Sequence, residues 1–200
     1  MIPTPLAELA EVTGGRIAGL GESEAGGLTI TGNTFLCSNT VSNFSWIVIK
    51  PYGSGHTLSG LTVMGNVFKS VYATIDRVER VDTSFANLDL TRMRNVRFEG
   101  NTFHGVRTPT SNPLYISHAQ NTAAARWVVP TGGALPFNGQ ALKVQTVVAE
   151  GAITTSTGAR NNDLPSIQVR QGTAKDQVYL DFSQPVKGGV GVQVRMDNPG

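Results

Sequence analysis

The stretch Leu28–Phe35, with the sequence LTITGNTF, occurs in three copies along the chain. The other two copies are Leu61–Phe68 (LTVMGNVF) and Val96–Phe103 (VRFEGNTF). In every copy an apolar–polar–apolar triplet and one further residue precede Gly-Asn, and a Phe follows two positions after the Asn. The asparagines of successive copies are 33 and 35 residues apart. Such a fixed period is typical of repeat proteins, in which one copy cannot bury its apolar face alone and therefore stacks on the next.

The alternation within each copy predicts a short strand, because successive side chains of a strand point to opposite faces. In the first copy Leu28 and Ile30 lie on one face, and Thr29 and Thr31 lie on the other. Gly-Asn ends the strand, and we expect the Asn to adopt the left-handed backbone conformation that bends the chain. Stacked copies then form a ladder of amide side chains and an internal stack of aromatic rings, made by Asn33, Asn66 and Asn101 and by Phe35, Phe68 and Phe103.

The residues between the copies supply further elements of each turn. Trp46–Lys50 is rich in β-branched residues and predicts a second strand. Phe85–Leu90 alternates and predicts the counterpart of that strand one turn later. Pro51–His56 contains a proline and two glycines, which is typical of a protruding loop. Lys69–Asp82 stays open between helix and strand, because its apolar residues have helical spacing but are largely β-branched.

A different pattern begins after about Thr108, where short β-rich runs alternate with clusters of Gly, Pro, Asn and Asp. This pattern is typical of an antiparallel sheet or a small sandwich. Turns are predicted at Pro130–Gly133 and at Lys187–Gly189. The expected strands are Trp127–Val129, Ala141–Val148, Ile167–Arg170, Gln177–Phe182 and Val190–Arg195. We expect three parts: a lead-in or cap over residues 1–27, a stack of repeats over 28–110, and a β-rich part over 111–200 that closes the open end of the stack.

The composition excludes several classes of protein. Of the 200 residues, 40% are hydrophobic and 15% are charged, with a net charge of +2, which does not indicate disorder or nucleic-acid binding. No apolar run is long enough to span a membrane, and Met1–Pro5 lacks the features of a signal peptide. The single cysteine, Cys37, excludes an intrachain disulfide framework. The spacing of His56, His104 and His118 is not that of metal ligands, so we expect neither a metal nor a cofactor.

The Gly-Asn-x-Phe copies, each preceded by an apolar–polar–apolar triplet, resemble the turns of right-handed parallel β-helix proteins of the pectate-lyase-like type. The resemblance covers about residues 28–106. A β-helix followed by a β-sandwich is similar to the receptor-binding end of bacteriophage tailspikes and to the head spikes of phage-like gene transfer agents. Three recognisable turns are fewer than such proteins usually have.

This resemblance implies an all-β chain with a short right-handed parallel β-helix over residues 28–110. An antiparallel β-sandwich over residues 111–200 follows, with a role in trimerisation or receptor binding. The resemblance also implies a homotrimer, located outside the cell on the surface of a virion or phage-like particle. Members of this group bind or cleave the polysaccharides of bacterial surfaces.

Cleavage of a polysaccharide by hydrolysis needs two carboxyl groups about 5–10 Å apart, one as acid and one as base or nucleophile. Asp89 and Glu99 are the weak candidates, because both are expected to face outward on different strands of the last turn. Ion pairs with neighbouring arginines explain the same acids without catalysis. A calcium-dependent lyase site is not indicated, because the acids do not recur at outward positions of successive copies.

The sequence contains more residues that are suited to binding a sugar than to cleaving one. Carbohydrate sites combine flat aromatic faces with side chains that form hydrogen bonds to hydroxyl groups, and arginines attract acidic sugars. The candidate ligand-binding residues are Tyr52, His56, Tyr72, Arg92, Arg94 and Arg97. The alternative is that these side chains keep a β surface soluble or contact neighbouring subunits.

Three functions therefore stay open. The preferred one is a module of a homotrimeric virion spike that attaches to the capsular polysaccharide of a host bacterium. The second is a depolymerase, either a glycoside hydrolase or a lyase, that acts on the same glycan. The third is a purely structural trimerisation domain. None of the three involves nucleic acid or insertion into a membrane.

Overall fold

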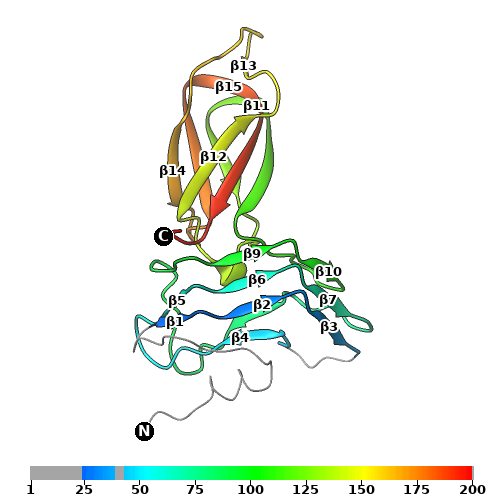
Figure 1. Ribbon diagram of the computed structural model, residues 1–200. Coiled ribbons are helices and arrows are strands. Elements are labelled where there is room, and N and C mark those ends of the chain that lie inside the picture. The colour runs from blue at the N-terminus through cyan, green and yellow to red at the C-terminus, as the bar shows by residue number, and fades with distance from the viewer. Residues whose placement is uncertain (1–23, 39–42, 200) are drawn as a thin grey trace. The chain divides into compact units, whose positions relative to one another are not determined.

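The computed structural model describes residues 24–38 and 43–199. The fold is all-β, as expected: these residues form strands and one short 3-10 turn, Pro136–Asn138. The chain divides into two compact units (Figure 1). The first unit runs to Ser111 and includes Asp197 and the residues after it, and the second unit is Asn112–Met196. Most of the predicted lead-in, residues 1–23, lies outside the described residues.

The strands of the first unit are three or four residues long, and all of them pair in parallel. They are β1 (Glu24–Gly26), β2 (Thr29–Thr31), β3 (Thr34–Cys37), β4 (Ile47–Ile49), β5 (Thr57–Ser59), β6 (Thr62–Met64), β7 (Val67–Ser70), β8 (Glu79–Val81), β9 (Arg97–Glu99) and β10 (Thr102–His104). The sheet orders are β2-β6-β9, β3-β7-β10, β1-β5 and β4-β8. Figure 1 shows β2, β6 and β9 lying one above the next.

The three sequence copies lie beside one another in matching register. Ile30 pairs with Val63, which pairs with Phe98, and Phe35 pairs with Phe68. Of these residues, Val63, Phe68 and Phe98 are fully buried, as the alternation predicts. Full burial of such a side chain contributes roughly 1.5–3 kcal/mol, so the apolar face of each copy is stabilised by its neighbours.

The expected aromatic stack is confirmed. The rings of Phe35 and Phe68 are 4.8 Å apart between centroids with an interplanar angle of 5°, and those of Phe68 and Phe103 are 5.9 Å apart at 10°. The expected asparagine ladder is also confirmed, because the side-chain nitrogens of Asn33 and Asn66 donate to the Oδ1 atoms of Asn66 and Asn101. The asparagines lie at the bend between consecutive strands of a copy, and the phenylalanines lie in the strand that follows it.

The expected backbone conformation at this bend is wrong. The left-handed residue is the glycine of each copy, with φ of +66° at Gly32, +61° at Gly65 and +63° at Gly100. Glycine adopts this conformation without the penalty that a Cβ imposes. The asparagine that follows is thereby free to take a conformation that aims its amide along the stack.

The strand expected at Phe85–Leu90 is wrong as well. The partner of β4 is β8, which lies in the ambiguous stretch Lys69–Asp82, and that stretch contains no helix. The Ser84 backbone N–H donates to the Asp82 carboxylate, and that of Thr91 donates to Asp89, at 3.0 and 2.9 Å. Such local bonds compete with strand pairing. The segment between them is therefore a surface loop.

The second unit is built around one long strand. Its strands are β11 (Leu114–Pro130), β12 (Lys143–Ala149), β13 (Thr154–Thr155), β14 (Ser166–Gln171) and β15 (Gln177–Arg195). Every other strand pairs with β15 in antiparallel orientation. Four of the five expected strand regions fall within these elements, two of them inside the single strand β15. The fifth, Ala141–Val148, overlaps β12, which begins two residues later. The chain turns at Gly132 and Gly133 as expected. The core contains Trp127, Leu180 and Val192, which are fully buried.

The turn predicted at Lys187–Gly189 is wrong, because these residues lie inside β15. Gly188 pairs with Gln120, and Gly189 pairs with Ala119. A Cβ added to Gly188 would lie 3.0 Å from the Ala152 carbonyl oxygen. These glycines therefore mark a close approach of backbone rather than a change of direction.

Candidate functional site

Two loops of the first unit come together to form an open pocket of about 530 Å³. Its walls are residues 53–55, from the loop predicted at Pro51–His56, and residues 85–89, from the loop that replaces the expected strand. The backbone N–H of Asp89 donates to the His56 carbonyl oxygen at 2.7 Å. The Arg92 Nη1 donates to the Gly55 carbonyl oxygen at 3.3 Å. These bonds hold the two loops against each other.

An aromatic surface lies beside this pocket. The rings of Tyr52 and Phe85 are 5.5 Å apart between centroids, and the two side chains are 39% and 65% exposed. The ammonium group of Lys50 lies 5.9 Å from the centre of the Tyr52 ring. Exposed pairs of large aromatic side chains offer flat apolar area at low conformational cost. We call Tyr52 and Phe85 the aromatic shelf.

Polar side chains adjoin the aromatic shelf. His56 packs against Gly53, where an added Cβ would lie 2.9 Å from the imidazole Nε2. Asp89 lines the pocket, and Arg92 reaches the loop that carries His56. Hydrogen-bond donors and acceptors therefore stand at the edge of an apolar surface, which is the arrangement that saccharide ligands require.

The Asp89 carboxylate is held in its charged form. The Thr91 hydroxyl and backbone N–H donate to Asp89 Oδ1 at 2.7 and 2.9 Å. These two bonds lower the pKa of Asp89 below its usual value of 3.8, and the charge of Arg92 lowers this pKa further. At neutral pH Asp89 accepts hydrogen bonds and does not donate a proton.

The structure does not bring the other expected site residues to this pocket. Tyr72, 84% exposed, follows β7, and Arg97 and Glu99 lie on β9. The backbone of Arg94 forms isolated parallel β-bridges with Ser59 and Asn198. Among the residues that the structure describes, no hydrogen bond or ion pair joins Asp89 to Glu99.

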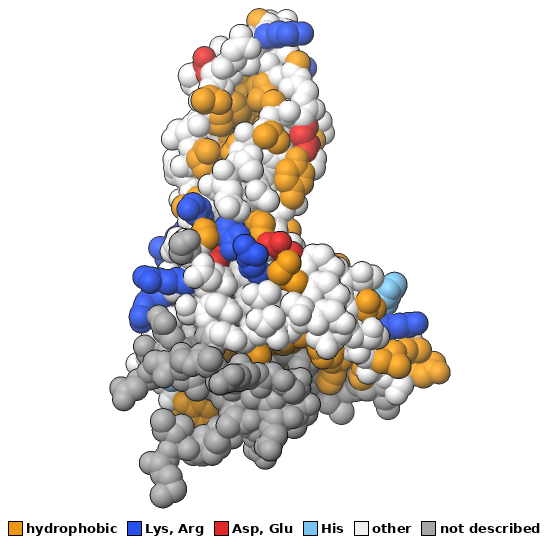
Figure 2. Space-filling model, in the orientation of Figure 1, with side chains coloured by type: hydrophobic (Ala, Val, Ile, Leu, Met, Phe, Trp, Pro, Cys, Tyr) orange, Lys and Arg blue, Asp and Glu red, His pale blue; other side chains and the backbone are white. Residues whose placement is uncertain are grey.

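Phe85 is the pocket residue that the sequence did not suggest, because it was assigned to a strand. The signal was the Asp82–Ser84 pair before it, whose hydrogen bond forms an Asx turn and carries Phe85 to the surface. Figure 2 shows Lys and Arg side chains gathered toward the β5 end of the first unit. Arg94 forms a β-bridge with Ser59, the last residue of β5. Within residues 24–38 and 43–199, no group of three or more His, Cys, Asp or Glu residues is placed to hold a metal ion.

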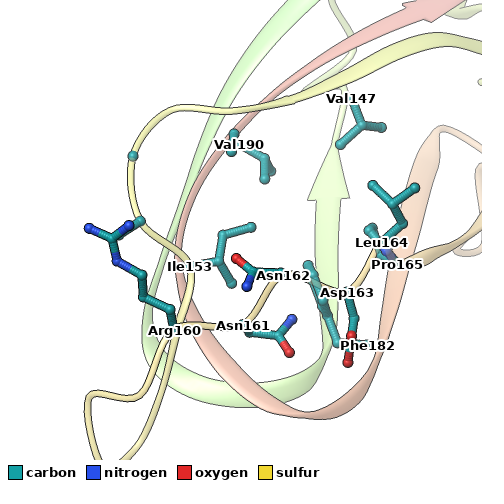
Figure 3. Close-up of a pocket in the computed structure, with 13 residues that line it drawn as sticks. Val147, Ile153, Arg160, Asn161, Asn162, Asp163, Leu164, Pro165, Phe182 and Val190 are labelled. Carbon is teal, nitrogen blue, oxygen red and sulfur yellow. The ribbon is translucent and has the colours of Figure 1, made fainter.

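A second pocket, of about 350 Å³, lies within the second unit (Figure 3). Val147 and Val190 lie at one end of it, and Asn161, Asp163 and Phe182 lie at the other. The buried Nδ2 of Asn161 has no hydrogen-bond partner. The pocket therefore contains a polar group without a partner. A buried donor without an acceptor destabilises the folded state by ~1–3 kcal/mol.

Comparisons with protein-family models, with curated proteins and with solved structures find no match to this chain. In the described part of the chain, no helix has the length and apolar character needed to cross a membrane.

Proposed function

We propose that this chain is a glycan-binding module of a virion spike, which attaches to the capsular polysaccharide of a bacterium. The observation that carries the proposal is the aromatic shelf of Tyr52 and Phe85 beside the ionised Asp89. An aromatic face packs against the C–H groups of a sugar ring, and a carboxylate accepts hydrogen bonds from its hydroxyl groups.

The fold that we propose is a short right-handed parallel β-helix followed by an antiparallel β-sandwich. The in-register parallel pairing of β2, β6 and β9 supports the first part. The antiparallel pairing of all other strands with β15 supports the second. A β-helix of so few turns buries limited area, and small cores gain stability from association. This favours a homotrimer on the surface of a virion or phage-like particle.

A depolymerase of the same glycan is the weaker proposal. Hydrolysis needs a protonated acid as well as a base, and the lowered pKa of Asp89 removes this residue as the acid. Glu99 lies on β9, outside the lining of the pocket. A purely structural trimerisation domain would have no use for an exposed aromatic pair beside a polar pocket.

The test is titration of the ¹⁵N-labelled protein with neutral and acidic capsular oligosaccharides, followed by NMR. We expect shifts of the amides in residues 52–56 and 85–92. Absence of binding at millimolar oligosaccharide would overturn the proposal. Incubation with the intact polymer distinguishes the depolymerase, which shortens the chains. Light scattering tests the trimer, whose mass is three times the 21.2 kDa of one chain.

A further inference from the structure

The pocket of the second unit has walls that are fixed by backbone hydrogen bonds. The Asn161 N–H donates to the Ile153 carbonyl oxygen, and the Thr155 N–H donates to that of Ala159, both at 2.8 Å. β13, between these residues, pairs with β15 at Lys187 and Val186. The segment that carries the polar residues is therefore attached to the central strand, and the pocket is largely preformed.

The Asn161 side chain is oriented by one bond and leaves one group free. Its Oδ1 accepts a hydrogen bond of 3.4 Å from Gln184 Nε2. Its Nδ2 is buried and has no partner. The oxygen keeps a second acceptor position, whereas the nitrogen is a donor with no partner among the described residues. In Figure 3 the amide lies at the end of the pocket where Asp163 and Phe182 also lie. A ligand with a hydrogen-bond acceptor at this point would satisfy the donor.

Asp163 supplies the complementary group. Its Oδ2 accepts a hydrogen bond of 2.7 Å from the Ser183 hydroxyl. A carboxylate has about four acceptor positions, so Asp163 retains capacity for a donor on a ligand. The Arg160 side chain extends away from the other lining residues in Figure 3. Asp163 is thus the charged group at this end of the pocket, and its negative charge disfavours an anionic ligand.

The remaining walls are apolar. Val147, Ile153, Phe182 and Val190 line the pocket, and Leu164 at its edge is 92% exposed. A volume of about 350 Å³ is at the lower end of the range of small-molecule sites. The site thus combines a donor, an acceptor and a small apolar space. A ligand group that matches all three has a carbonyl oxygen, an N–H and a methyl group.

We propose that this pocket binds the acetamido group of an N-acetylated amino sugar. The carbonyl oxygen accepts from Asn161 Nδ2, the N–H donates to Asp163, and the methyl group packs among Val147, Ile153 and Phe182. The inference rests on the proposed function in one respect, that the ligand is a saccharide. It adds a second sugar site, made of residues other than the aromatic shelf, and it specifies the class of sugar.

The experiment compares N-acetylglucosamine with glucose, which has a hydroxyl where the acetamido group stands, by NMR titration of the ¹⁵N-labelled full chain. We expect N-acetylglucosamine to shift the backbone amides of residues 147–165 and the Asn161 side-chain NH₂, and glucose to leave them unchanged. Asn161→Asp keeps the shape of the side chain and removes the donor, so we expect binding to weaken about tenfold. Asn121→Asp makes the same change of charge at an exposed position of β11 and should bind normally.

An equal response to both sugars, or shifts confined to residues outside the pocket, would overturn the inference. So would the absence of any shift, which means that the pocket holds water only. If Asn161→Asp alters the whole spectrum, Asn161→Ala serves as the second variant that removes the donor. A chain whose aromatic shelf binds oligosaccharide while this pocket ignores N-acetylglucosamine would keep the proposed function and reject this inference. A chain that binds no saccharide at either place would lose both.

Discussion

The side-chain nitrogen of Asn66 donates a hydrogen bond of 3.0 Å to the Oδ1 of Asn101, which lies 35 residues further along the chain. The backbone N–H of Asn66 donates to the same oxygen, also at 3.0 Å. The Asn66 Nδ2 additionally donates to the Ile30 carbonyl oxygen at 2.9 Å. Asn66 is fully buried, so its amide fixes the register between successive copies.

Replacement of Asn66 by Ala should destabilise the protein more than any other substitution in the ladder. It removes the hydrogen bonds from the buried Asn66 amide to the part-buried Ile30 carbonyl oxygen and Asn101 Oδ1, at a cost of about 1–3 kcal/mol. Asn33→Ala is the matched control, because Asn33 makes the same contact from an exposed position. Urea unfolding measures both. Equal losses of stability would mean that the ladder does not depend on burial.

Substitutions at two glycines with nearly the same φ distinguish the effect of backbone strain from that of steric collision. Gly65, with φ of +61°, has no atom within 4 Å of an added Cβ, whereas at Gly105, with φ of +65°, that atom would collide with the Ser70 backbone. Gly65→Ala should cost ~1–2 kcal/mol through conformation alone. Gly105→Ala should cost ~1–3 kcal/mol more, because the packed backbone must move. Thermal unfolding of the two variants tests the order, and the reverse order would refute this account.

Removal of one ring of the aromatic shelf should weaken glycan binding. We expect Phe85→Ala to bind a capsular oligosaccharide about tenfold less tightly, a change of ~1.4 kcal/mol, with the fold intact because Phe85 is 65% exposed. Tyr72→Ala removes a more exposed ring that is absent from the pocket lining. Isothermal titration should therefore give this control the affinity of the unaltered protein. A greater loss of affinity for Tyr72→Ala would place the glycan site at the end of β7 and contradict the role of the aromatic shelf.

Because Asp89 stays ionised to low pH, its charge should make glycan binding depend on pH only in acidic solution. Its pKa in the folded chain lies below 3.8, through hydrogen bonds from Thr91 and the charge of Arg92. The resulting contribution to stability is present above pH 3.8 and is lost as the pH falls through the folded-state pKa. The part of glycan binding that depends on the Asp89 charge should likewise be constant from neutral pH to about pH 5. Thr91→Val removes the hydroxyl bond and should move the acid midpoint to higher pH.

The measurement is the pH titration of the Asp89 side-chain carbon by NMR, with affinity recorded in parallel. Asp82 provides an internal reference, because Ser84 lowers its pKa in the same way and Thr91→Val leaves it untouched. A shift of both midpoints in the variant would indicate a global change. An unchanged Asp89 midpoint would contradict the role given to the Thr91 hydroxyl.

The repeat was predictable because its signal is carried by the sequence alone. Asn66 and Phe68 have counterparts at the same places of the other two copies, 33 residues before and 35 after, and such matching positions predict stacking in register. The left-handed residue was misplaced because the pair Gly65-Asn66 contains two candidates, and sterics favour the glycine. Lys187–Gly189 was misplaced because glycine marks both turns and close backbone approach, which only the neighbouring Ala152 and Ile153 distinguish.

The candidate site was predictable in part for the same reason. Tyr52 and His56 share one loop, so their proximity follows from the sequence. Their proximity to Asp89 and Arg92 depends on stacking by one turn, which the period suggests. Phe85 was missed because its alternating neighbours indicate a strand, and the local hydrogen bond from the Ser84 N–H to Asp82 that prevents this strand was given no weight beside the alternation. Asn161 carries no sequence signal, since its orphaned nitrogen is visible only with Gln184 in place.

The Met196 N–H donates to the Asn112 Oδ1 at 3.0 Å, so the first and last residues of the second unit are tied together. After them the chain resumes in the first unit, where the Asp197 carboxylate accepts from the Val96 N–H at 2.8 Å. In topological terms the second unit is a cassette with adjacent ends. Exchange of this cassette would leave the first unit, with its aromatic shelf, unbroken, so the two units can diverge independently of each other.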